Sequence, residues 1–184
     1  KVLKMCDSSD ALTLGCQHGE DSLSFQCKSA LHDRVSSFSI KLMQIDSQYL
    51  EMPEQQYKVV FKFPSLQFLK MCRNFKELGD TMRIHARPEG ITFSTQGDLV
   101  SGSVTFHGRA SENVEERISL TVLEPVTASF TLRYLVSFAK ASSLSASVEL
   151  SLGVSVPLLV KYDFQPAHHG HLQFYLAPKI VDCV

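Results

Sequence analysis

The chain is organised around Leu42-Met-Gln-Ile-Asp-Ser-Gln-Tyr-Leu-Glu-Met-Pro-Glu-Gln-Gln-Tyr57, a segment that joins two strand-like stretches of sequence. It contains no glycine that would form a tight turn. Ahead of Pro53 it carries several apolar side chains, namely Ile45, Tyr49, Leu50 and Met52. Linkers between domains are normally polar, because an exposed apolar side chain gains nothing from contact with water. This linker therefore indicates a segment that lies on a surface and binds another molecule.

Composition and charge narrow the classes of function. Of the 184 residues, 44% are hydrophobic and 20% are charged, which is typical of a globular protein with one or two domains. No apolar run reaches the length of about 18 residues that a membrane-spanning helix needs, so we expect no membrane span. The net charge of −1 gives no support by itself for nucleic-acid binding.

The cysteines suggest thiols and not cross-links. Their number is odd and they form no C-x-x-C pair: Cys6, Cys16, Cys27, Cys72 and Cys183. This pattern predicts buried or free thiols in a reducing compartment, in place of a disulfide framework or a zinc site.

A helix is predicted over Ser65–Leu78. Its apolar residues recur at the spacing of one helical face: Phe68, Met71, Cys72, Phe75 and Leu78. Pro64 and Ser65 supply a start signal and Gly79 supplies a stop signal. Lys70 and Arg73 point away from the apolar face. Shorter helices are predicted at Lys1–Asp7 and Arg133–Lys140, and both also carry basic residues.

Basic residues on three helices of a nearly neutral chain are open to two interpretations. If the helices share one surface, that surface would bind DNA phosphates without reading the base sequence. For any single helix, however, basic residues on a solvated face are ordinary.

The rest of the chain is predicted to form short strands with a period of two. The predicted strands cover Leu12–Cys16, Leu23–Cys27, Val35–Met43, Tyr57–Phe63, Thr81–Ala86, Ile91–Thr95, Val100–Phe106, Ile118–Val122, Ala128–Thr131, Ser147–Leu152, Pro157–Tyr162 and His171–Leu176. Many short strands with few helices predict an α+β layout of antiparallel sheets with helices on one side. A basic helix followed by a strand meander occurs after Lys4 and again after Lys140. This recurrence is either an internal repeat or a chance similarity of alternating strands.

Several strings along the chain are similar to those of the proliferating cell nuclear antigen family, the eukaryotic DNA sliding clamps. They are Lys41-Leu-Met43, Met52-Pro-Glu-Gln-Gln-Tyr57, Met71-Cys-Arg73, Glu124-Pro125, Leu132-Arg-Tyr-Leu135, Val156-Pro-Leu158, Gly170-His-Leu172 and Tyr175-Leu-Ala-Pro-Lys-Ile180. The resemblance implies the sliding-clamp fold, in which antiparallel sheets lie outside and helices line one face in repeated helix-plus-strands units.

The resemblance also implies a domain organisation. Residues 1–42 would be the second half of clamp domain 1, residues 43–56 the interdomain connecting linker, and residues 57–184 clamp domain 2. The first half of the family's first domain has no counterpart here. In a complete domain, roughly seventy to eighty residues would precede Lys1.

The function implied by the resemblance is that of a non-enzymatic processivity factor in the nucleus. Such a clamp encircles duplex DNA as a homotrimer, without sequence preference and without a cofactor or metal. Its partners would be DNA polymerases, the clamp loader and repair proteins that bear the motif Gln-x-x-[Ile/Leu/Met]-x-x-[Phe/Tyr]-[Phe/Tyr]. Tethering these clients raises their effective concentration at the DNA.

Matched residue by residue, the resemblance implies three surfaces. The DNA-facing surface comprises Lys1, Lys4, Lys62, Lys70, Arg73, Arg133 and Lys140. The groove for client peptides comprises Leu50, Met52, Pro53, Gln55, Pro157, Tyr175, Ala177, Pro178 and Lys179. The subunit interface pairs Val35–Leu42 of one copy with Asp98–Phe106 of the next, through Val35, Phe38, Ile40, Leu99 and Gly102.

Two alternatives stay open. The first is a subunit of the related heterotrimeric checkpoint clamp, although the linker and the string at Tyr175–Ile180 favour the homotrimeric clamp. The second is a small metal-dependent enzyme that uses the loop His168–His171, because imidazoles are common zinc ligands. No cysteine or carboxylate cluster lies at a compatible spacing from that loop. Neither glycine-rich nucleotide-binding motif is present, so we expect no bound nucleotide.

Overall fold

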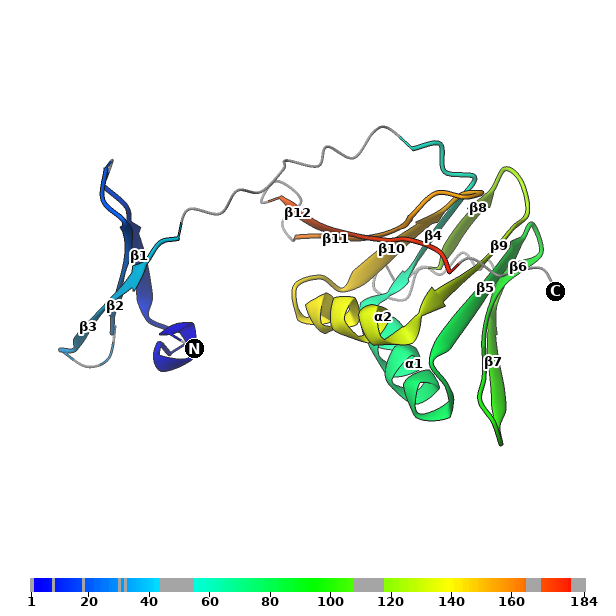
Figure 1. The fold of residues 1–184 in the computed structure, drawn as a ribbon, viewed down its shortest axis with the longest axis horizontal. Helices are drawn as coiled ribbons and strands as arrows, with labels where there is room; N and C mark the ends of the chain where they lie inside the picture. Colours follow the sequence, from blue (N-terminus) through cyan, green and yellow to red (C-terminus); the bar gives the residue numbers. More distant parts are fainter. Residues whose placement is uncertain are drawn as a thin grey trace. The chain divides into compact units, whose positions relative to one another are not determined.

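The computed structural model describes residues 2–7, 9–17, 19–29, 31, 33–43, 55–107, 118–164 and 170–179. Internal contacts divide the chain into two compact units, Lys1–Met52 and Pro53–Val184. Figure 1 shows the helices and strands of each unit. Among the described helices, none combines the length and the apolar character needed to cross a membrane.

The first unit contains a short helical turn and one small sheet. The 3-10 helix η1 (Val2–Met5) precedes β1 (Ala11–Gly15), β2 (Ser22–Lys28) and β3 (Val35–Lys41), which pair antiparallel in the order β1-β2-β3. Gly19, with φ +89°, occupies the left-handed region in the turn between β1 and β2, where a side chain would be strained. The helix predicted over Lys1–Asp7 is realised only as this one turn, because so short a segment cannot stabilise an α-helix by itself.

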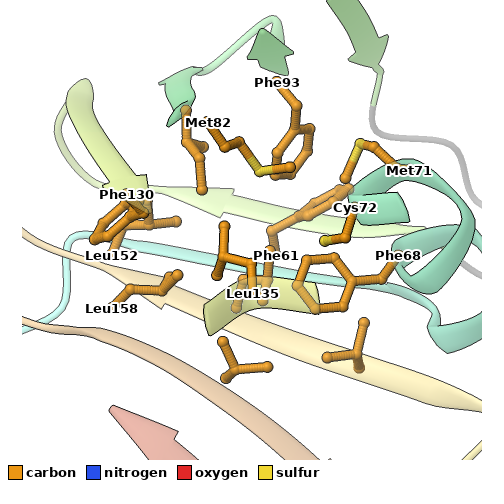
Figure 2. Packing of buried hydrophobic residues seen from close by; sticks show 14 of the residues in the cluster. Phe61, Phe68, Met71, Cys72, Met82, Phe93, Phe130, Leu135, Leu152 and Leu158 are labelled. Carbon is orange, nitrogen blue, oxygen red and sulfur yellow. The ribbon is translucent and has the colours of Figure 1, made fainter. Parts of the chain in front are cut away.

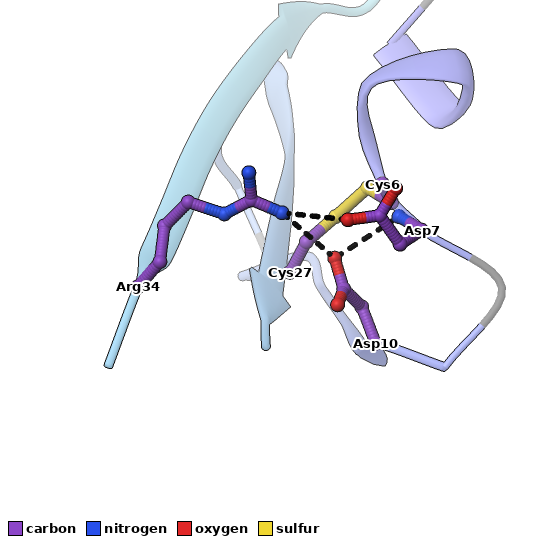
Figure 3. A network of polar contacts seen from close by, with 5 residues as sticks. All are labelled: Cys6, Asp7, Asp10, Cys27 and Arg34. Atoms are coloured by element: carbon purple, nitrogen blue, oxygen red, sulfur yellow. Dashed lines mark hydrogen bonds and ion pairs between the residues drawn. A yellow bond between two sulfur atoms is a disulfide. The ribbon is translucent and has the colours of Figure 1, made fainter. Parts of the chain in front are cut away.

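The cysteine prediction is wrong for one pair. Cys6 and Cys27 form a disulfide that joins the residue after η1 to β2, across a sequence separation of 21 residues (Figure 3). Their Cα atoms lie 6.0 Å apart, a distance that a disulfide can bridge, and sequence spacing alone could not reveal it. Cys16 and Cys72 are free thiols, as expected, and Cys183 lies outside the described residues.

In its described residues, the second unit contains two antiparallel sheets. One is five-stranded, in the order β12-β11-β10-β4-β8. Its strands are β4 (Val59–Pro64), β8 (Ser119–Val122), β10 (Ser147–Leu152), β11 (Leu158–Asp163) and β12 (His171–Leu176). The other is four-stranded, in the order β7-β6-β5-β9. Its strands are β5 (Thr81–Arg87), β6 (Gly90–Gln96), β7 (Ser101–Phe106) and β9 (Val126–Thr131).

Two helices complete the described part of this unit. Helix α1 (Ser65–Leu78) follows β4 directly, and helix α2 (Leu132–Ala139) follows β9 and runs into the 3-10 turn η3 (Lys140–Ser143). The helices pack against each other, and Figure 1 shows them side by side. These helices and antiparallel sheets confirm the predicted α+β class.

The bounds of α1 follow from its sequence. Pro64 has no backbone N–H to donate to a sheet, so β4 ends there, and the helix begins at Ser65. The hydroxyl of Ser65 is buried and donates to the backbone oxygens of Ser142 and Ser145, which fixes the start of α1 against the segment after α2. The helix ends before Gly79, whose N–H donates to the oxygen of Phe75 at 3.0 Å.

An aromatic core holds the second unit together. In β4 the alternate residues Val59, Phe61 and Phe63 are fully buried, and Phe61 stacks on Phe63 with ring centroids 4.5 Å apart. Phe93 from the four-stranded sheet lies close to both rings. Figure 2 shows how α1 and α2 add side chains to this cluster, with Phe68, Met71 and Cys72 from α1 and Leu135 from α2. The predicted apolar face of α1 is thus confirmed as its buried face.

Candidate DNA-binding and protein-binding surfaces

The helical layer of the second unit gathers basic side chains on its solvent side. Because α1 buries Phe68, Met71, Cys72 and Phe75, it leaves Lys70 and Arg73 exposed on the opposite face. Arg133 of α2 and Lys140 of η3 are also exposed. None of these four cations forms an ion pair with another of the described residues. The two packed helices therefore present four cations that are unpaired within the described part of the chain on one layer, with Glu77 of α1 as an exposed carboxylate on the same helix face as Lys70 and Arg73.

Arg133 is held in position by its neighbour. Its guanidinium lies over the ring of Tyr134, 4.8 Å from the ring centroid, and donates to the Tyr134 hydroxyl at 2.8 Å. This contact restrains the long side chain without neutralising its charge, so Arg133 stays available to an anion.

The other basic residues expected to face DNA lie elsewhere. Lys62 is half-buried on β4, on the face opposite Phe61 and Phe63, and stands across from Glu149 of β10 in the sheet register. It is therefore not on the helical layer. Lys4 is exposed on η1, in the first unit, and Lys1 lies outside the described residues.

Several residues expected in the client groove lie close together at the point where the pairing of β11 with β12 ends. In this hairpin Leu158 pairs with Leu176, which places Pro157 beside Ala177 one step further along. Tyr175 is 38% exposed on β12, and its hydroxyl donates to the side-chain oxygen of Gln173 at 3.2 Å. Pro178 and Lys179 follow directly. The remaining groove residues fall on the linker: Gln55 is described and partly buried, whereas Leu50, Met52 and Pro53 lie outside the described residues.

A second tyrosine lies near the groove residues. Burial raises the pKa of Tyr57 above its usual value, and the proximity of Tyr175 raises this pKa further. The Tyr57 hydroxyl is buried and has no hydrogen-bond partner within the described part of the chain. Tyr57 thus lies near Tyr175 of β12.

The C-terminal segment after β12 is anchored to the four-stranded sheet. The N–H of Lys179 donates to the oxygen of Ser129 at 2.7 Å, and its amine donates to the hydroxyl of Thr81 at 2.8 Å. Pro178 and Lys179 line a surface cavity of about 610 Å³, together with Val126, Ala128 and Val154. Sequence reasoning found Pro178 and Lys179 but missed the cavity wall, because that wall comes from strands distant in the sequence.

The two segments expected at the subunit interface are edge strands. Within the described residues, β3 is one of the two edge strands of its sheet, and β7 is one of the two edge strands of the four-stranded sheet. Both carry exposed apolar residues, with Val35 53% exposed on β3 and Leu99 97% exposed before β7. Ile40 is exposed and Phe38 is half-buried. Such edges offer unpaired backbone groups to a further strand.

Gly102 occupies a tight position on β7. A Cβ atom at this residue would lie 3.1 Å from Cδ1 of Leu78 at the end of α1. The direction in which a side chain would point therefore faces α1. Gly102 could contribute only its backbone groups to pairing with a strand of a neighbouring copy.

The metal-site alternative receives no support from the described residues. Among them, no three histidine, cysteine or carboxylate side chains lie close enough to share an ion. His171 is exposed at the start of β12, but His168 and His169 lie outside the described residues, so this hypothesis stays untested.

Comparison with known protein families agrees with the geometry. The family model for the proliferating cell nuclear antigen C-terminal domain matches residues 51–179, and the model for the N-terminal domain matches residues 1–50. The two matches together extend over nearly the whole chain. With the antiparallel sheets and the paired helices, they show that the chain belongs to the proliferating cell nuclear antigen family of DNA sliding clamps, a non-enzymatic fold that serves DNA replication and repair.

Proposed function

We propose that this chain is a replicative sliding clamp that works in the nucleus as a homotrimer. It encircles duplex DNA and tethers DNA polymerases, the clamp loader and repair proteins through their Gln-x-x-[Ile/Leu/Met]-x-x-[Phe/Tyr]-[Phe/Tyr] motifs. The observation that carries the proposal is the helical layer with Lys70, Arg73, Arg133 and Lys140, exposed and without ion-pair partners among the described residues.

The helical layer suits DNA that must slide. Its long basic side chains can follow phosphate oxygens, which are alike at every base pair, so the contact carries no sequence preference. Lys1 and Lys4 would add charge to the DNA-facing surface in the assembled ring, whereas Lys62 lies on the face of β4 that is turned away from the core.

Topology gives the decisive test of encirclement. The protein is loaded onto a nicked circular plasmid by a clamp loader, and the bound fraction is measured before and after the plasmid is linearised. A clamp stays on the circle and slides off the linear ends. Equal retention on circular and linear DNA would overturn the proposal.

Charge removal tests the helical layer itself. In Lys70→Ser/Arg73→Ser, the slope of log affinity against log salt should fall by about 2 for each subunit of the ring that contacts the DNA, because each such subunit loses two phosphate contacts. Arg83→Ser/Arg87→Ser removes the same charge from the sheet and serves as the matched control. A control variant with the same change in slope would show that net charge, and not this layer, governs DNA binding.

The client groove is tested with a peptide of the pattern Gln-x-x-Leu-x-x-Phe-Phe in a calorimetric titration. Tyr175→Ala should weaken binding by about tenfold or more, since a partly exposed aromatic residue in a groove is a typical anchor. Tyr134→Ala removes an exposed tyrosine from α2 and is the control. Equal affinity for the wild type and Tyr175→Ala would place the client site elsewhere.

Assembly distinguishes this proposal from the checkpoint clamp. Pairing of β3 with β7 of a neighbouring copy would make three identical interfaces and close a ring. Light scattering should then give a mass near three times 20.5 kDa. A chain that assembles only with two different subunits would instead fit the checkpoint clamp.

A further inference from the structure

The outward face of the four-stranded sheet has an unusual composition. Strand register sets Arg83 of β5 beside Ser94 of β6 and Ser129 of β9, and sets His85 beside Thr92 and Thr127. Arg87 ends the same line of β5 residues. The inward residues, such as Met82 and Ile84, belong to the core. At every outward position of these strands the residue is basic, hydroxyl-bearing, Gln96 or Gly90.

The two arginines of this face have no ion-pair partner among the described residues, although Glu89 lines the same hollow as Arg87. Both Arg83 and Arg87 are exposed. No carboxylate stands at an outward strand position, and the nearest acidic residue along the chain, Glu89, lies in the turn after β5. Two arginines surrounded by serine and threonine hydroxyls provide hydrogen-bond donors and positive charge together.

The face is also hollowed around Arg83. This residue lines a surface cavity of about 460 Å³ that it shares with Ser94 and Ser103. It lines the cavity of about 610 Å³ with Pro178 and Lys179 as well. A third hollow, of about 620 Å³, is lined by Arg87, His85 and His107. The basic side chains therefore lie beside space that an elongated ligand can enter.

The spacing of the basic residues favours an extended peptide. Arg83, His85 and Arg87 are alternate residues of one strand, so their side chains repeat at about 7 Å along β5. Alternate side chains of any extended peptide repeat at the same distance, which allows acidic residues at alternate positions to meet them one by one. Single-stranded nucleic acid has a similar phosphate repeat, but proteins bind it by stacking bases on aromatic rings. No phenylalanine, tyrosine or tryptophan stands at an outward position of these strands, and His85 is the one ring there.

We propose that the outward face of β7-β6-β5-β9 is a docking surface for an extended acidic segment of a partner protein, held by Arg83 and Arg87 and flanked by Lys179. This surface is separate from the basic helical layer of α1 and α2. It also does not need the client motif, although Lys179 lies at its border with the client groove.

The test measures the fluorescence anisotropy of a labelled peptide of six Glu-Gly repeats, with six Gln-Gly repeats as the uncharged control. The acidic peptide should bind in a salt-dependent way and the control peptide should not. Arg83→Ser/Arg87→Ser should weaken binding by about tenfold, since each exposed ion pair contributes up to about fivefold. Arg83→Lys/Arg87→Lys keeps the charge and should retain most of the affinity.

Lys70→Ser/Arg73→Ser is the matched control, because it removes the same charge from the helices and should leave peptide binding unchanged. Absent peptide binding, or an equal loss in both serine variants, would overturn the proposal. So would an oligothymidylate that displaces the peptide and depends on Arg83 and Arg87, since the face would then be a nucleic-acid site. Retention on circular DNA does not involve these arginines, so failure here is distinguishable from failure of the clamp proposal.

Discussion

The two units of this chain hold their sheets together by different means. In Pro53–Val184 a continuous core joins both sheets and both helices, with Phe61, Phe63 and Phe93 at its centre. In Lys1–Met52, Cys27 is the one apolar side chain that is fully buried among the described residues. That unit is instead fastened by the Cys6–Cys27 disulfide and by ion pairs of Arg34.

The difference shows where each unit finds its stability. A core of packed rings stabilises by removing apolar surface from water, and it needs many residues to do so. The small sheet buries too few apolar residues to be stabilised in this way. The disulfide instead limits the conformations that the chain can adopt when the sheet unfolds, and Arg34 contacts Asp7 (3.0 Å) and Asp10 (3.5 Å) in the folded unit (Figure 3). Its apolar residues on β1 and β3 remain exposed and suited to contact with another surface.

The largest loss of stability is expected from a substitution in the core of the second unit. Phe61→Ala removes a ring that stacks on Phe63 at 4.5 Å and leaves a cavity between the sheets, so the free energy of unfolding should fall by about 4 kcal/mol. Urea denaturation followed by circular dichroism measures it. Leu66→Ala, at a position 68% exposed on α1, is the control and should change stability by less than about 0.5 kcal/mol. Equal stability of the two variants would show that the aromatic cluster is not the main support.

The next effect concerns the disulfide of the first unit. Cys6→Ala keeps the packing of Cys27 but opens a cross-link that spans 21 residues, which should cost this unit about 3 kcal/mol. Hydrogen exchange of the β1 and β2 amides should accelerate, while amides of β4 and α1 stay protected. Cys16→Ala removes an exposed free thiol and is the control. Unchanged exchange in Cys6→Ala would mean that the ionic contacts suffice.

A smaller effect is expected at the start of α1. Ser65→Ala leaves the buried carbonyl oxygens of Ser142 and Ser145 without their donor, which should cost about 2 kcal/mol. Thermal unfolding of the variant measures the loss, with the exposed Ser137→Ala on α2 as the control. A loss no larger than that of the control would show that water replaces the hydroxyl.

The smallest effect on stability is expected from an ion pair on the surface of the second unit. The hydrogen bond and charge of Lys76 lower the pKa of Asp80 in the folded protein. A carboxylate whose folded pKa is lowered adds stability above its ordinary pKa, and this contribution disappears as the pH falls through the lowered value. Lys76→Gln should return the pKa of Asp80 towards its ordinary value in a carbon-detected NMR titration. Lys70→Gln should leave it unchanged, and identical titration curves in wild type and Lys76→Gln would contradict the pairing.

Local signals made parts of the fold predictable from the sequence. The helix Ser65–Leu78 has the predicted bounds, because its period, Pro64 and Gly79 all act within the segment itself. The strands Ser147–Leu152 and His171–Leu176 also match, since alternation is a local pattern. The helix predicted over Lys1–Asp7 does not match, because only the single turn η1 forms there. Single-turn helices depend on tertiary contacts that a local sequence pattern does not contain.

Features that depend on distant parts of the chain were missed. The Cys6–Cys27 link needs the register of the small sheet, which sequence spacing does not give. Arg83 was simply part of the predicted strand Thr81–Ala86, and Arg87 was placed just after its end; they become one basic face only when β6 and β9 pair on either side of β5. In the same way, Lys62 shares the charge of α1 but lies on a strand face away from it. A sequence shows which residues are charged, but the pairing of strands decides on which surface those residues lie.

The attachment of Lys179 has a mechanical consequence. The chain leaves β12 in the five-stranded sheet and then bonds to Ser129 and Thr81 in the four-stranded sheet, so the C-terminal segment fastens one sheet to the other. A load applied to this segment by a tethered protein is divided between both sheets. It therefore pulls against the whole core, instead of peeling a single edge strand from its neighbour.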